Sequence, residues 1–215
     1  MTPRRHALLG LASVGVILLG MVSAGVAYRG RVDEAYSPLN HFISELGEIA
    51  ASKLAAAFNL GILVGGLGLL AFLMILARRL DGRYRKTFIG LGAVSGVAGA
   101  LVGVFPMDYR DLHQIVAGVF FLTGWLTTVV LSLWLVRAAA PNLPRWLLVP
   151  GAVVVVATLT FIPVFSGYRP ANPGGPVLDR PDGVWSVAVL EWAALLSLLA
   201  WFVCVSLALL REPPE

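Results

Sequence analysis

Charged side chains are scarce in this chain. Only 13% of its 215 residues are Asp, Glu, Lys or Arg, whereas 58% are hydrophobic. A soluble domain carries about 25% charged residues, and a chain of this size has too little interior to bury so much apolar surface. The lack of charge therefore excludes an ordinary water-soluble globule and indicates a protein whose solvent is the lipid bilayer.

Cysteine and histidine are also rare, with one Cys and three His in the chain. The single cysteine, Cys204, excludes an intramolecular disulfide, and its position in the last apolar run favours a packing role. The net charge of +4 would suit a nucleic-acid partner. The basic residues, however, lie mostly between apolar runs on one side, as membrane insertion requires, so no nucleic-acid partner is expected.

Six apolar runs are long enough to cross a bilayer, which takes about 20 residues at a rise of 1.5 Å each. They cover residues 7–28, 54–77, 87–106, 115–136, 146–167 and 184–210. The first run follows Arg4 and Arg5 as a signal peptide would, but it is longer than a signal core, so we expect a retained span. The sequence predicts an all-α polytopic membrane protein in which residues 1–215 form a single domain, a compact six-helix bundle.

The distribution of Lys and Arg predicts the orientation of that bundle. Residues 78–86, a short segment between the second and third runs, contain five basic residues. Short loops rich in Lys and Arg remain in the cytoplasm. With the N-terminus inside, ten basic residues fall on the inner side and six on the outer side. We therefore expect a multi-pass protein of the cell membrane with both termini cytoplasmic.

Glycines recur at a spacing of four residues in the second and third runs, in the pairs Gly61 and Gly65, Gly92 and Gly96, and Gly99 and Gly103. This spacing lets helix backbones approach closely, which drives helix association in lipid. The glycine-rich third run is therefore expected at the centre of the bundle.

The outer connection between the first and second runs carries distinctive polar residues. The Ser-Pro pair at 37–38 is a helix-start signal and predicts a short amphipathic helix over residues 39–46. Helical spacing places four polar side chains on one face: His41, Ser44, Glu45 and Glu48. Such a face suits metal ligands or an acid–base pair, or else it is a solvated face lying on the membrane surface.

The connection between the third and fourth runs is so short that Asp108 and His113 must both lie at the outer boundary. Histidines and carboxylates at one level of a bundle are suited to a metal site or a proton relay, although His113 alone would also serve as a helix cap. One hypothesis is that a divalent metal, for example Zn²⁺, binds to His41, Glu45, Asp108 and His113. Ser44 or Glu48 would then orient a water molecule or act as the base.

Two polar residues lie deeper in the predicted bundle. Asn59 and Glu191 are about six and seven residues into their spans, roughly 10 Å below the outer surface. A carboxyl group at that depth is expensive, so Glu191 is expected to face the interior as a candidate catalytic residue, within reach of Asn59 in a polar cavity. The alternative is a structural hydrogen bond from Glu191 to Asn59, Thr160 or Ser186.

These residues lie in strings that resemble a known family: NHFISELG at 40–47, FNLG at 58–61, and GVFPMD at 103–108 with His113 after it. The chain resembles, over nearly its whole length, the six-span prokaryotic membrane proteins catalogued as domain of unknown function 998 (DUF998). The resemblance implies the fold and a membrane location, but no reaction, substrate or cofactor. A looser likeness is to membrane hydrolases of the alkaline-ceramidase and adiponectin-receptor type, which have seven helices. This chain has too few outer histidines for a three-histidine site.

Three kinds of function are left open by the sequence. The first is a metal-dependent hydrolase acting on a lipid or a lipid-linked substrate at the outer boundary. The second is a lipid-binding or small-molecule-binding or transport protein, with Glu191 lining an outward-facing cavity. The third is a structural membrane subunit. A standalone secondary transporter is disfavoured because no inverted repeat is recognisable.

Overall fold

The computed structural model describes residues 1–139, 142–168 and 183–212. In that part of the chain the structure is helical and contains no strand, which confirms the predicted class. The α-helices are α1 (Pro3–Ala27), α2 (Ala55–Leu76), α3 (Gly82–Val102), α4 (Arg110–Arg137), α5 (Leu148–Gly167) and α6 (Ser186–Leu210). Short 3₁₀ helices are η1 (Ile43–Gly47), η2 (Ala77–Arg79), η3 (Met107–Tyr109) and η4 (Arg145–Leu147). Each α-helix covers one of the six apolar runs, with its ends displaced by a few residues.

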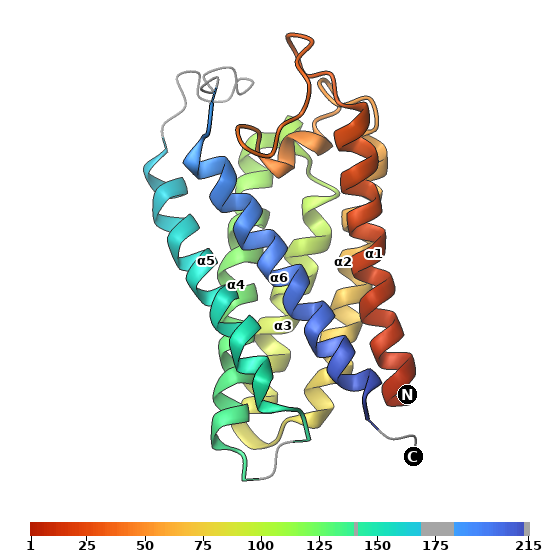
Figure 1. Ribbon diagram of the computed structural model, residues 1–215, viewed down its shortest axis with the longest axis vertical. Helices are drawn as coiled ribbons and strands as arrows, with labels where there is room; N and C mark the ends of the chain where they lie inside the picture. The colour runs from red at the N-terminus through yellow and green to blue at the C-terminus, as the bar shows by residue number, and fades with distance from the viewer. Residues whose placement is uncertain (140–141, 169–182, 213–215) are drawn as a thin grey trace.

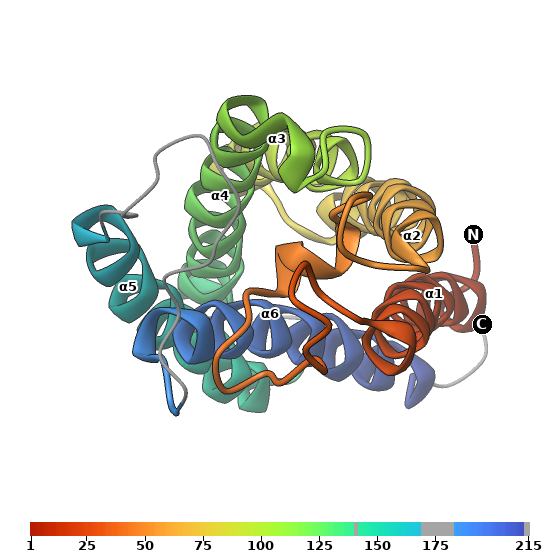
Figure 2. The same ribbon diagram turned by 90° about the horizontal axis from the view of Figure 1, so that it is seen from above.

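The six helices are arranged as a ring in chain order (Figure 2). Each packs against the next from α1 to α6, and α6 also packs against α1, which closes the ring. The third helix lies in this ring between α2 and α4. The expectation that the glycine-rich third run is the central helix is therefore wrong, because its glycines face α2 and α4 rather than the whole bundle.

Five helical segments are long and apolar enough to cross a membrane, covering residues 3–27, 55–79, 107–137, 145–167 and 186–210 of the described chain. Their outward faces carry apolar side chains such as Leu19, Val26 and Val149, which is the arrangement expected in lipid. These helices indicate a membrane protein. The remaining helix, α3, is less apolar because basic residues fill its first turn and glycines replace larger apolar residues.

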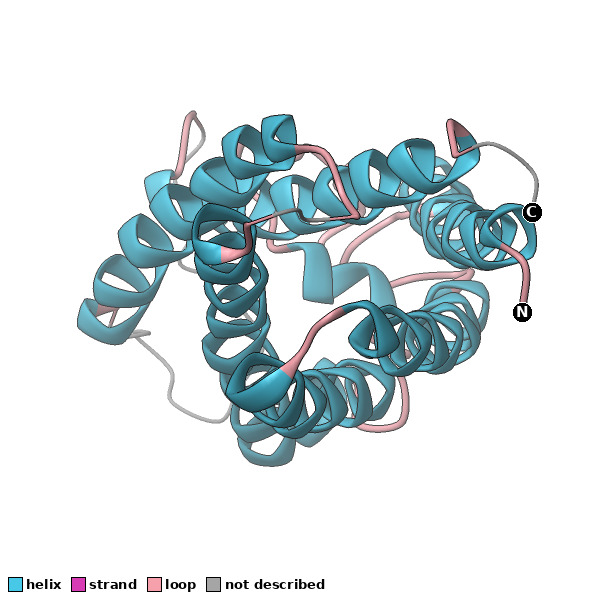
Figure 3. Ribbon diagram, turned by 90° about the horizontal axis from the view of Figure 1, so that it is seen from below, coloured by secondary structure: helices cyan, strands magenta, loops and turns pink. Residues whose placement is uncertain are grey.

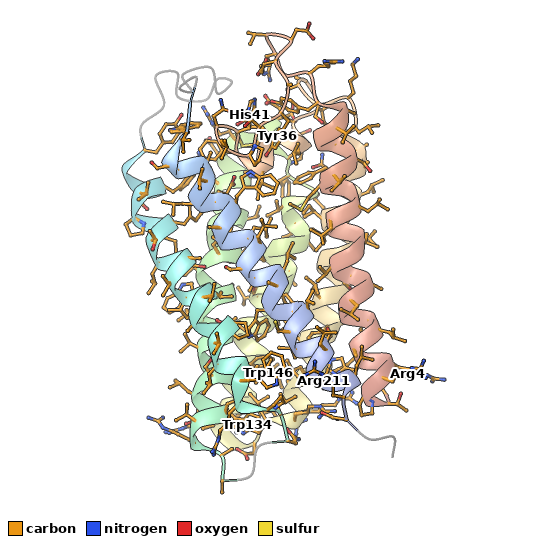
Figure 4. The ribbon with its side chains drawn as sticks, viewed as in Figure 1. Arg4, Tyr36, His41, Trp134, Trp146 and Arg211 are labelled. Carbon is orange, nitrogen blue, oxygen red and sulfur yellow. The ribbon has the colours of Figure 1, made fainter. Side chains whose placement is uncertain are left out.

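The two ends of the bundle differ in their side chains. Arg4 and Arg211 lie at the end where α1 begins and α6 ends, and Trp134 and Trp146 lie near that end (Figures 1 and 4). There Arg79 donates to the Glu212 carboxylate at 2.6 Å, which ties the end of α6 to η2. Tyr36, with the short helix η1, lies at the opposite end, which we call the η1 end.

Helices α1 and α2 approach closely where Gly20 and Gly61 face each other. A Cβ atom added at Gly20 would lie 2.8 Å from the Ala57 carbonyl oxygen, and one added at Gly61 would lie 3.1 Å from the Val16 carbonyl oxygen. The neighbours are backbone atoms, which cannot move aside as a flexible side chain can. Glycine at these two positions therefore permits the contact on which the α1–α2 pair depends.

Gly20→Leu should force α1 away from α2 and lower the midpoint of thermal unfolding in detergent. Overpacking of this kind costs about 1–3 kcal/mol, which corresponds to a shift of roughly 3–10 °C for a chain of this size. Gly15→Leu is the matched control, because a Cβ atom at Gly15 on the same helix meets open space. Equal midpoints for the two variants, measured by scanning fluorimetry, would contradict this account of the packing.

Candidate functional site

The segment between α1 and α2 folds into one mouth of the ring. Seen from above, η1 lies inside the circle of helices, and seen from below it is visible through the middle (Figures 2 and 3). All five residues of η1 are buried, as are His41 before it and Glu48 after it. The expected amphipathic surface helix is therefore wrong: the segment is one 3₁₀ turn, and its polar side chains are enclosed by the bundle.

Side chains of the surrounding helices satisfy the backbone of this buried turn. At its start, the Ile43 N–H donates to Glu191 Oε2 on α6 at 2.7 Å. At its end, Asn59 Nδ2 on α2 donates to the Gly47 carbonyl oxygen at 2.9 Å. Glu191 and Asn59 thus bind opposite ends of η1 and share no hydrogen bond with each other.

The carboxylates around η1 are occupied by nearby donors. Asp108 Oδ2 accepts from the Ile49 N–H at 2.8 Å, and Glu45 Oε1 accepts from the Phe42 N–H at 2.8 Å. Glu48 is paired with the Arg31 guanidinium, whose Nε lies 2.9 Å from the carboxylate. Glu48 lines neither of the two cavities described below, so the structure places it in an ion pair away from them.

The four proposed metal ligands, His41, Glu45, Asp108 and His113, do not converge. His41 Nδ1 lies 2.8 Å from Asn40 Oδ1, whereas His113 Nδ1 lies 2.8 Å from the Phe105 carbonyl oxygen. In the described ranges 1–139, 142–168 and 183–212, no three His, Cys, Asp or Glu side chains are grouped so that they could hold a metal ion. The expected convergence fails because backbone N–H groups and other local donors bind the carboxylates.

An aromatic cluster holds His41 instead. The Tyr36 ring lies 5.1 Å from the His41 ring, 5.2 Å from the Tyr28 ring and 6.1 Å from the Trp192 ring, centroid to centroid. The Tyr36 hydroxyl donates to the Phe42 carbonyl oxygen at 2.9 Å. Burial raises the pKa of the Tyr36 phenol, and the nearby Glu191 and Glu45 carboxylates raise it further, so the phenol remains a neutral donor.

Two cavities meet beneath η1. A central cavity of about 80 Å³ lies inside the ring, and its walls are apolar except for Ser44, Ser95, His113 and Glu191. A second cavity of about 390 Å³ lies between α4 and α5 and reaches η1 and α6. The residues that line both cavities are Ser44, His113, Ala117, Phe121 and Glu191. We call the three polar members, Ser44, His113 and Glu191, the junction site.

The junction site is not arranged as a hydrolytic triad. In a triad the acid binds the histidine Nδ1–H, and Nε2 faces the serine hydroxyl. Here His113 Nδ1 is bound to the Phe105 carbonyl oxygen, and Glu191 accepts from the Ile43 N–H. The acid therefore does not orient the histidine as in a triad, and the three side chains form a polar group at the edge of two largely apolar cavities.

Sequence reasoning named all three junction residues but placed them in different groups. Ser44 was expected beside a metal, His113 as a ligand, and Glu191 with Asn59. It missed the apolar walls, such as Phe121 and Phe161, because aromatic residues in an apolar run give no signal that separates a cavity wall from a packing contact.

Glu191→Leu should destabilise the η1 end, because the buried Ile43 N–H then has no acceptor. A loss of about 1–3 kcal/mol is expected, seen as a fall of roughly 3–10 °C in the unfolding midpoint. Glu191→Gln keeps a carbonyl oxygen for the same N–H and should lose clearly less. If Leu and Gln at this position give the same midpoint, Glu191 does not hold η1.

One family model matches this chain, that of the proteins described as "Protein of unknown function (DUF998)", and it covers residues 11–208. The match extends from α1 to α6 and so includes η1 and all three residues of the junction site. No curated protein and no solved structure matches the chain. The chain belongs to the DUF998 family.

Proposed function

We propose that this protein spans the membrane six times and binds an amphiphile, a lipid or a lipid-like small molecule, in the cavity between α4 and α5. The observation that carries the proposal is the shape and chemistry of that cavity. Its volume of about 390 Å³ is in the range of ligand sites, and its lining is apolar along most of the walls and polar toward the η1 end.

The apolar wall is continuous and largely aromatic. The Phe121 ring lies 5.1 Å from the Phe161 ring, which lies 5.4 Å from the Phe165 ring, and Leu122 and Ile162 complete the surface. These side chains offer a hydrocarbon chain the contacts that a bilayer interior would offer, in a fixed arrangement. An acyl or prenyl chain is the ligand part that such a wall accommodates.

The polar residues of the same cavity lie toward the η1 end. Arg110 and Gln114 line it near the start of α4, Ser166 lines it near the end of α5, and the junction site lies beside η1. A ligand with an apolar chain and a small polar head therefore matches the cavity along its length. A wholly polar solute would leave the aromatic wall exposed to water.

Access from the bilayer is favoured by the position of α5. Only 28% of its apolar window is buried, compared with 44–50% in the other four candidate spans. It packs against α4 and α6 at the edge of the bundle (Figure 2). A lipid-facing helix at the side of an apolar cavity suits entry of an amphiphile sideways from the membrane.

We also propose that α3 crosses the membrane and that both termini are cytoplasmic. α3 packs between α2 and α4, which are both candidate spans, so it must share their depth in the bilayer. Its first turn, with Arg83, Arg85 and Lys86, follows Arg78 and Arg79 in one short connection, which favours the cytoplasmic side. The η1 end would then lie on the extracytoplasmic side.

Gly118→Trp should block the proposed site and remove most of the bound lipid. Gly118 lines the α4–α5 cavity, and a Cβ atom there meets open space, so an indole enters the cavity without a backbone clash. Bound lipid is measured by native mass spectrometry of protein purified in mild detergent and then offered bacterial lipid in mixed micelles.

Gly15→Trp is the matched control for this experiment. Gly15 is also an exposed helical glycine with open space at its Cβ position, but it lines neither cavity. It should retain lipid as the unsubstituted protein does. Equal retention by the two variants, or no lipid on the unsubstituted protein, would contradict amphiphile binding at this site.

The proposed topology is tested by labelling single cysteines in a Cys204→Ser background. Val32 at the η1 end and Asp81 before α3 are both exposed and lie at opposite ends of the bundle. In intact cells a membrane-impermeant maleimide should label Val32→Cys, and it should label Asp81→Cys only after permeabilisation. Labelling of both cysteines in intact cells, or the reverse pattern, would refute the orientation.

A further inference from the structure

The hydrogen bond of His113 fixes which of its ring atoms faces the cavities. Nδ1 lies 2.8 Å from the Phe105 carbonyl oxygen, which can only accept, so Nδ1 carries the hydrogen. In the neutral ring Nε2 then has a lone pair and no hydrogen. His113 is buried and lines both cavities, so the edge opposite Phe105, which holds Nε2, is the edge that a ligand meets.

The other two junction residues line both cavities together with His113. The Ile43 N–H donates to Glu191 Oε2, which engages one oxygen of that side chain. The Ser44 hydroxyl has one hydrogen and two lone pairs, so it can donate to a polar head or accept from it.

His113 Nε2 is thus a hydrogen-bond acceptor beside the largely apolar walls of the central cavity. A buried acceptor is costly unless a donor reaches it, and an anionic head would set its own lone pairs against that of Nε2.

We infer that the ligand of this site carries a hydrogen-bond donor at its polar end, a hydroxyl or an amine, which binds at His113 Nε2 beside Glu191 and Ser44. This inference rests on the proposed binding of an amphiphile and adds the chemical class of its head group. The ligand's hydroxyl or amine would donate to Nε2 in place of the solvent that satisfies a buried acceptor in other proteins.

The inference is tested with amphiphiles that share one chain and differ at the head. Full-length protein in detergent is incubated with radiolabelled 1-dodecanol, and unlabelled 1-dodecanol, dodecylamine, dodecyl methyl ether and dodecanoic acid compete for it. The alcohol or the amine should compete at least about tenfold better than the ether, which has the same oxygen but no donor. Dodecanoic acid, ionised at neutral pH, should compete no better than the ether.

One variant assigns the preference to the junction site. His113→Asn keeps an amide N–H for the Phe105 carbonyl and removes Nε2, so the alcohol and the ether should compete nearly equally. A matched control is His6→Asn, because His6 is a buried histidine bound to the Phe72 carbonyl oxygen at 2.9 Å, outside both cavities.

The possible failures are distinguishable. Equal competition by the alcohol and the ether, or stronger competition by the acid, overturns the donor inference while amphiphile binding stands. A preference for the alcohol that survives in His113→Asn overturns the assignment to Nε2. Failure of the unsubstituted protein to bind 1-dodecanol, together with no lipid lost in Gly118→Trp, overturns the proposed function itself.

Discussion

The hydrogen bond between the Ile43 N–H and Glu191 is the contact on which the η1 end depends. A single 3₁₀ turn cannot satisfy its own backbone, and an apolar bundle offers no water to do so. The helices therefore supply the partners: Glu191 at the start of the turn, Asn59 at its end and Asp108 just beyond. The polar residues at this end of the molecule are therefore needed because the buried backbone of η1 is not in an α-helix and requires hydrogen-bond partners.

The inserted turn also explains why the bundle has an interior space. Six helices in a ring enclose more volume than their side chains fill when no helix occupies the centre. The turn closes one mouth of that ring without reaching its middle, which leaves the central cavity below Ser44. Because Ser44, His113 and Glu191 border both cavities, the same residues serve the fold and the candidate site. This double role accounts for a serine, a histidine and a glutamate that meet without the bonds of a triad.

The sequence predicted the helical class and the positions of the apolar runs because long hydrophobic segments have few alternatives in lipid. It also singled out the residues at the η1 end, since a buried carboxyl or histidine stands out in an apolar chain. It could not predict their partners. The periodicity of residues 41–48 fitted a helical face, yet backbone donors at Phe42, Ile43 and Ile49 bind the carboxylates first. The sequence also did not predict the order of the helices around the ring, and so it did not predict the cavity between α4 and α5.

Asp108 gives this arrangement a mechanical property. It precedes α4, which forms one wall of the larger cavity, and its carboxylate binds the backbone just after η1, at Ile49. Helix α4 and the closed mouth of the ring are thus linked by a short, charge-assisted connection. If a guest wedges α4 away from α5, the strain is transmitted along this link to the turn and then to the start of α2. A ligand bound between α4 and α5 would in this way change the conformation of the surface at the η1 end, where another molecule can bind.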